Sequence, residues 1–175
     1  MSKHLAQAAQ ADAAMPRRRA LAALGLAATA VGMGVGSLPA PAQAAGRVKL
    51  ALAQSLPAEL AAALAHKQPL LVMVSLAGCP FCMQVRDSYL GPLRDEQGQR
   101  MVQVDMRSNA PVVRFDGQRS THDELTRAWA ISIAPTLLFF GPQGRELAPR
   151  LLGSTLPDFY GAYLAQRLLQ AQAAL

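Results

Sequence analysis

The sequence contains two cysteines, Cys79 and Cys82, which are separated by Pro80 and Phe81 in the run GCPFC. Two intervening residues allow the first sulfur to lie at the N-terminus of a helix and the second to lie one turn later, close enough to form a disulfide. Exposed amides and the helix dipole at that terminus favour the thiolate. The spacing therefore predicts Cys79 as the attacking sulfur and Cys82 as the resolving sulfur.

The two residues between the cysteines fit this arrangement. Pro80 suits the first turn of a helix, where its missing N–H is no loss. Phe81 gives the site an apolar flank without a charge or a titratable proton. A purely structural disulfide is a weaker interpretation, because closing a loop this short removes little conformational entropy from the unfolded chain and so stabilises the fold little.

A Cu(I) carrier is an alternative, because thiolates are soft ligands for that ion. Such a site needs a further ligand, and the candidates His66, His122 and several Met are not at a diagnostic spacing from the cysteine pair. We interpret both histidines as surface residues. The redox chemistry needs no cofactor, and we predict no metal site.

The apolar pattern predicts helix, strand, helix, strand, helix, strand, strand, helix. Thr121 and Glu124 form a capping box at the start of the third helix. A mixed central sheet flanked by helices, an α/β class, follows from this order. The predicted ranges are 56–66, 70–76, from the cysteines to a break at Gly91-Pro92, 101–106, 121–131, 132–141, 144–153 and 156–170, with a loop over 108–120.

Cys79 follows the buried strand 70–76, so it lies where α/β sheets commonly expose chemistry. A later apolar strand begins with Ala134-Pro135-Thr136. Proline would remove a ladder hydrogen bond inside a central strand, so we expect Pro135 at its first residue, with a cis peptide bond before it.

The chain resembles the thioredoxin superfamily over nearly all of residues 45–175. The runs that carry the resemblance are LLVMVSLAGCPFCMQV, VDM, WAISIAPTLLFFGPQGRE and LLGSTLPDFYGAYL. The resemblance implies a thioredoxin-like fold in which Cys79 and Cys82 are the redox pair. It also implies that Pro135 is a cis-proline packed against that pair, with Pro80, Phe81, Ala134 and Thr136 as supporting residues.

Two features depart from the family pattern. Thioredoxins proper carry Trp before the first cysteine and Gly-Pro between the two, where this chain has Gly78 and Pro80-Phe81. They also keep a buried Asp six residues before the first cysteine, where this chain has Met73. Proton transfer at Cys82 must then use water or another group.

The first 44 residues read as an export signal that is cleaved after Ala44, which leaves one domain at 45–175. Arg17–Arg19 precede an uncharged run that ends in Ala42-Gln43-Ala44. An uncleaved membrane anchor is the alternative, but the run is rich in Gly and poor in bulky apolar residues. Adjacent arginines also fit the twin-arginine route, although Ala20 stands where that pattern prefers a bulky residue.

The leader carries four of the 17 Lys and Arg and one of the 11 Asp and Glu, so residues 45–175 have a formal charge of +3. They contain no basic run, and we expect no nucleic-acid partner. We also expect a periplasmic location with no stable membrane association after cleavage.

Export and the CPFC site resemble periplasmic thioredoxin-like proteins, including those encoded with sulfur-oxidation systems. We expect a thiol-disulfide oxidoreductase, foremost a reductase, that acts on protein disulfides or thiols. The resemblance implies an inner-membrane electron donor of the DsbD type. A disulfide-forming oxidant, an isomerase, a Cu(I) metallochaperone and a non-catalytic binding module remain alternatives.

Overall fold

The computed structural model describes residues 47–154 and 157–175, so the predicted export signal lies outside the described residues, as does Leu156. The helices are α1 (Leu56–Ala65), α2 (Pro80–Val85), α3 (Gly91–Gln97), α4 (His122–Ala128) and α5 (Pro157–Ala173). The strands are β1 (Leu70–Ser75), β2 (Met101–Asp105), β3 (Pro111–Val113), β4 (Arg119–Thr121), β5 (Thr136–Gly141), β6 (Arg145–Glu146) and β7 (Leu151–Leu152).

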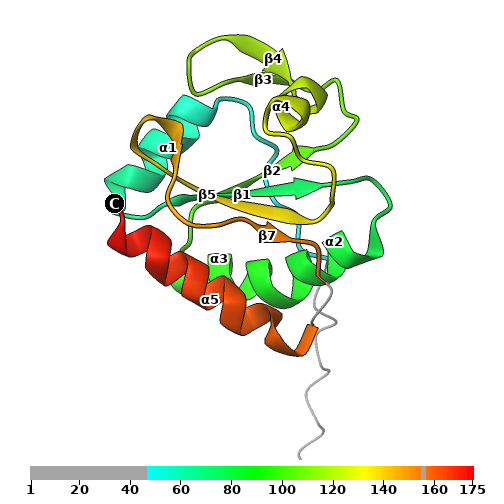
Figure 1. The fold of residues 1–175 in the computed structure, drawn as a ribbon, viewed down its shortest axis with the longest axis vertical. Helices are drawn as coiled ribbons and strands as arrows, with labels where there is room; N and C mark the ends of the chain where they lie inside the picture. The colour runs from blue at the N-terminus through cyan, green and yellow to red at the C-terminus, as the bar shows by residue number, and fades with distance from the viewer. Residues whose placement is uncertain (1–46, 155–156) are drawn as a thin grey trace, which may run out of the picture. The chain divides into compact units, whose positions relative to one another are not determined.

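The central sheet is mixed, as predicted. Its strands lie in the order β2, β1, β5, β6, and β7 also pairs with β5. β1 runs parallel to β2 and antiparallel to β5. Helices α1 and α4 cover one face of this sheet, and α2, α3 and α5 cover the other (Figure 1). This double cover explains why every residue of the apolar β1 is buried.

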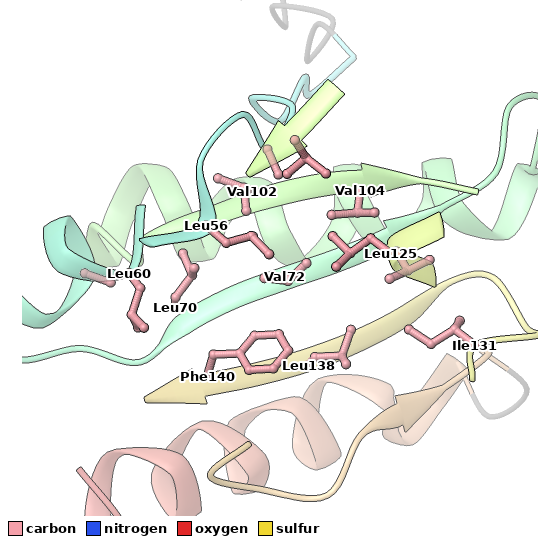
Figure 2. Packing of buried hydrophobic residues seen from close by; sticks show 14 residues of the cluster. Leu56, Leu60, Leu70, Val72, Val102, Val104, Leu125, Ile131, Leu138 and Phe140 are labelled. Atoms are coloured by element: carbon pink, nitrogen blue, oxygen red, sulfur yellow. The ribbon is translucent and has the colours of Figure 1, made fainter. Parts of the chain in front are cut away.

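Alternate residues of β1 supply two separate cores, because side chains of a strand point to opposite faces. Leu70 and Val72 pack with side chains from α1, α4, β2 and β5 on one face (Figure 2). Leu71 and Met73 pack on the other face in a cluster that includes Cys82. The second cysteine is therefore part of the hydrophobic core beneath α2.

Gly91-Pro92 does not break the helix that follows the cysteines, so that prediction was wrong. A π-helical turn, Arg86–Leu90, joins α2 to α3. The proline is the second residue of α3 and follows this π-helical turn, where the Gly91 N–H donates to the Arg86 carbonyl five residues earlier. The helix instead ends at Gly98, whose φ of +66° is the left-handed conformation that favours glycine at a C-terminus.

The segment 108–120, predicted as a loop, contains the strands β3 and β4, which form an antiparallel hairpin. Val113 of this hairpin also donates its N–H to the carbonyl of Gln54 at 2.9 Å. Each strand has only three residues, and β3 begins with proline. Strands so short carry too little alternation to be recognised in the sequence.

The segment 144–153, predicted as one strand, is divided into β6 and β7. Phe140 pairs with Glu146 and Leu137 pairs with Leu151. Residues 147–150 of the outer strand therefore lie opposite residues 138–139 of β5. The two extra residues form a bulge. Pro149 lies in the bulge and has no N–H for a ladder bond.

The capping box of α4 is confirmed. Thr121 Oγ1 accepts from the N–H of Glu124 at 3.2 Å, and Glu124 Oε2 accepts from the N–H of Thr121 at 3.0 Å. His122, the first residue of this helix, is fully buried, so its prediction as a surface residue was wrong. Its Nδ1 accepts from the N–H of Asp105 at 3.1 Å and its Nε2 lies 2.8 Å from the carbonyl of Ala53, which satisfies both ring nitrogens.

Candidate active site

The turn between β1 and α2 places the cysteines. Gly78 has a φ of +74°, a left-handed conformation that side-chain-bearing residues rarely adopt. The backbone conformation at this position therefore explains why the chain has glycine where thioredoxins proper have Trp. Cys79 follows in an extended conformation as the N-cap of α2, and Pro80 occupies the first turn as predicted.

Cys79 and Cys82 form a disulfide in the structure, with their Cα atoms 5.2 Å apart. The N–H of Cys82 donates to Cys79 Sγ at 3.2 Å, so the first turn of α2 presents an amide to the first sulfur. Cys79 is partly exposed, whereas Cys82 has no exposed surface. Only Cys79 is open to a large partner.

The strand after the predicted cis-proline meets the disulfide from the other side. The Ala134–Pro135 peptide bond is cis, and the Ala134 carbonyl oxygen lies 3.9 Å from Cys79 Sγ. Thr136 is fully buried and donates its hydroxyl to the Ile133 carbonyl at 2.7 Å. The fold thus brings together residues that lie 55 positions apart in the sequence.

We define the rim around Cys79 as residues 76–85, 131–136 and 151–154, which contain no Asp, Glu, Lys, Arg or His. Large apolar side chains of these segments are exposed instead: Phe81 by 59%, Ile133 by 49% and Leu152 by 60%. These segments contain no cationic side chain, and the N–H of Cys82 at the start of α2 is directed at Cys79 Sγ, where it can stabilise a thiolate.

Cys82 belongs to a hydrophobic cluster that also contains Met73, the residue at the position where thioredoxins proper keep a buried Asp. Burial raises the pKa of Tyr160, so this phenol stays protonated at neutral pH. That the proton of Cys82 leaves through water or another group stays a prediction.

Sequence reasoning found the disulfide and the cis-proline but missed part of their setting. Ile133 directly precedes Ala134-Pro135, and Leu152 lies opposite Thr136 across the β5–β7 pair. The N–H of Gly153 donates to the Pro135 carbonyl at 2.8 Å. The only sequence signal for this contact was the position of LLG at the end of an apolar run.

The alternative metal ligands lie elsewhere. His66 Nε2 is 2.7 Å from a guanidinium nitrogen of Arg100, and His122, the first residue of α4, is fully buried. Within residues 47–154 and 157–175, no group of three or more His, Cys, Asp or Glu side chains is arranged to hold a metal ion. Over the same residues, no helix has the length and apolar character needed to span a membrane.

Solved structures similar to this chain include several thioredoxins. Thioredoxin h from poplar is 17% identical, with a TM-score of 0.45 over 65% of this chain and 95% of its own. A DsbH oxidoreductase is 18% identical, with a TM-score of 0.48 over 73% and 88%. The periplasmic thioredoxin SoxS from Paracoccus pantotrophus is 23% identical, with a TM-score of 0.39 over 59% and 99%.

Identities this low say nothing about what the chain acts on. A search of curated proteins finds no match to the sequence. The model of the thioredoxin-like domain matches residues 56–168, which is more than half of the chain and includes the disulfide and the cis-proline. The predicted thioredoxin-like fold is thus confirmed, and the chain belongs to the thioredoxin-like domain family.

Proposed function

We propose that this chain is an exported thiol-disulfide oxidoreductase that reduces disulfides of partner proteins through Cys79 and Cys82. The observation that carries the proposal is the asymmetry of the pair. A partly exposed sulfur at the start of a helix is joined to a fully buried one, beside an uncharged rim. Such an arrangement lets the exposed sulfur attack a partner disulfide and leaves the buried sulfur to resolve the mixed disulfide.

In the proposed reaction, the Cys79 thiolate attacks one sulfur of a client disulfide. A mixed disulfide forms, and the other client sulfur leaves as a thiolate that takes up a proton. Cys82 then loses its proton and attacks Cys79 Sγ, which releases the second client thiol. The client gains two electrons and two protons, and the protein is oxidised to the disulfide seen in the structure.

The exposed apolar side chains of the rim favour clients that have apolar residues next to their disulfide. Phe81, Ile133 and Leu152 provide exposed apolar surface on the three rim segments. No charge on these segments would repel or select a charged peptide. The partners we propose are therefore proteins that present an extended, largely apolar segment at the disulfide.

The reductive direction is supported by the lack of cationic side chains in the rim segments. A strongly oxidising dithiol owes its potential to a reduced form that is stabilised, foremost through its thiolate. Here the segments around Cys79 supply helix amides and no cationic side chain. We accordingly propose that the reduced form is less stabilised, and that an oxidant or isomerase is the less favoured role.

A reductase that is oxidised in each cycle needs an external dithiol to restore it. For an exported protein, we propose an inner-membrane donor of the DsbD type. The predicted export signal and the CPFC dithiol support a place among periplasmic thioredoxin-like proteins, such as those encoded with sulfur-oxidation systems.

The test is a trapping experiment with a disulfide-bonded protein such as insulin. The Cys82→Ser variant should accumulate a mixed disulfide through Cys79, because no resolving thiol remains. The Cys79→Ser variant should accumulate none, because Cys82 is buried. If both variants reduced insulin as well as the parent does, the proposed function would be wrong.

A further inference from the structure

The bulge between β6 and β7 directs Arg150 toward the segment that carries the cis-proline. Bulges often occur beside active sites, where they change the direction of a side chain. Arg150 Nη1 donates to the carbonyl of Trp129 at 2.6 Å. Trp129 is the residue at which α4 ends and the segment 129–135 begins.

The side chain of Arg150 is itself held in place. Its Nε and Nη2 donate to the two carboxylate oxygens of Glu146 at 2.8 and 2.5 Å. Such a two-point pair fixes the plane of the guanidinium, which leaves Nη1 directed at one acceptor. The side chains of Arg150 and Glu146 are only 29% and 32% exposed, so solvent weakens this pair less than it would an open surface pair.

The bond to Trp129 has a specific mechanical role. The indole ring packs against Phe140, with ring centroids 5.3 Å apart, which fixes where Trp129 lies. The hydrogen bond from Arg150 to the Trp129 carbonyl also fixes the orientation of the peptide group between residues 129 and 130, and with it the direction in which the chain continues from α4 through residues 130–135. At the other end of this segment, the Pro135 carbonyl accepts from Gly153. The stretch 150–153 thus holds the segment 129–135 at both ends.

We propose that Arg150, held by Glu146, is a positioning residue for client binding by the segment 129–135. This inference rests on the proposed function and adds to it. Arg150 acts through Trp129, at the start of the segment that carries the rim residue Ile133 and the Ala134 carbonyl beside Cys79 Sγ. A client backbone must align with these groups before its disulfide meets the sulfur, and small misplacements of such groups are costly.

The test compares Arg150→Met with a matched control, Arg94→Met. Arg94 makes the same set of contacts elsewhere, because it donates to both oxygens of Asp95 and to the Lys49 carbonyl. Both variants should remain folded, since each affected side chain is partly exposed. Arg150→Lys, which retains the charge but cannot contact both acceptors, should fall between Arg150→Met and the parent.

The first measurement is steady-state reduction of an apolar peptide disulfide and of bis(2-hydroxyethyl) disulfide. Arg150→Met should raise KM for the peptide about tenfold, the worth of one charge-assisted hydrogen bond. The rate with the small disulfide should stay within about twofold, as should both rates of Arg94→Met. Equal losses with the two substrates, or equal losses in the two variants, would overturn the inference.

The second measurement is amide hydrogen exchange, which does not depend on activity. In the parent, the N–H of Ile131 donates to Thr126 and that of Gly153 to Pro135. Both amides should exchange faster in Arg150→Met and at the parent rate in Arg94→Met. Unchanged exchange would overturn the inference even in an active protein. An inactive parent would overturn the proposed function alone, and the exchange result would then decide the role of Arg150.

Discussion

Two regions of the domain each contain a side chain capable of chemistry, and the two side chains differ in exposure and in hydrogen bonding. His122, at the start of α4, is fully buried, and both of its ring nitrogens have backbone partners. Cys79, on the other side of the sheet, is partly exposed and lies next to one amide and one carbonyl. The comparison shows that exposure and free bonding capacity, more than residue type, separate a structural group from a reactive one.

The largest difference should appear within the reduced cysteine pair. At neutral pH, iodoacetamide should alkylate Cys79 at least about a hundredfold faster than Cys82, since a reactive thiolate must also be accessible. Mass spectrometry of peptides after short reaction times measures the two rates. Equal rates would show that burial of Cys82 does not separate the roles of the sulfurs.

Replacement of the enclosed histidine should affect stability rather than chemistry. His122→Ala leaves the Asp105 N–H and the Ala53 carbonyl without their partner, which should lower the free energy of unfolding by about 3 kcal/mol. Urea denaturation measures this loss. Alkylation of Cys79 in the folded variant should keep the parent rate.

The control for this substitution is His66→Ala, which removes an exposed histidine in contact with Arg100. Its free energy of unfolding should change by no more than about 0.5 kcal/mol. A loss as large as that of His122→Ala would contradict the contrast between the two histidines.

The apolar rim should contribute to client binding and not to folding. Ile133→Ser removes exposed apolar surface beside Ala134, and it should raise KM for an apolar peptide disulfide about fivefold. Leu169→Ser is the matched control, because Leu169 is 71% exposed on α5 and belongs to none of the rim segments. A rise in KM for both variants would indicate a general surface effect.

The smallest effect concerns Glu59, which lies on the same side of the sheet as His122. Burial raises the pKa of this carboxyl above 4.5, although N–H groups of Gln54 and Ser55 and the nearby His122 oppose the shift. The folded state therefore holds the proton more tightly than the unfolded state. Its contribution to stability is complete below pH 4.5 and is lost as the pH rises through the folded pKa.

The variant Glu59→Gln removes this titration. Urea midpoints measured between about pH 4 and pH 7 should fall for the parent relative to the variant as the pH rises. A constant difference between the two proteins over this range would contradict the raised pKa.

Local signals accounted for most of what the sequence predicted. The CxxC spacing, the capping box at Thr121 and the cis-proline act over a few residues, and the structure contains each of them, although Pro135 directly precedes β5 and is not its first residue. The position of Cys79 at the end of β1 followed from the apolar run before it. These features need no knowledge of distant partners.

The features that the sequence did not predict depend on packing between distant segments. His122 is buried because Ala53 and Asp105 provide partners from other parts of the chain. The bulge exists because β5 pairs with β6 and β7 in two registers. Arg150 could not be linked to the site before that bulge was known. Periodicity along one segment contains none of this information.

The reductive direction is the central claim, and the equilibrium reduction potential tests it most directly. The protein should be equilibrated against glutathione buffers, and the fraction of the Cys79–Cys82 disulfide measured by thiol labelling. We predict a value near about −270 mV, the thioredoxin end of the range. A value near about −120 mV, typical of a disulfide-forming oxidant, would contradict the account.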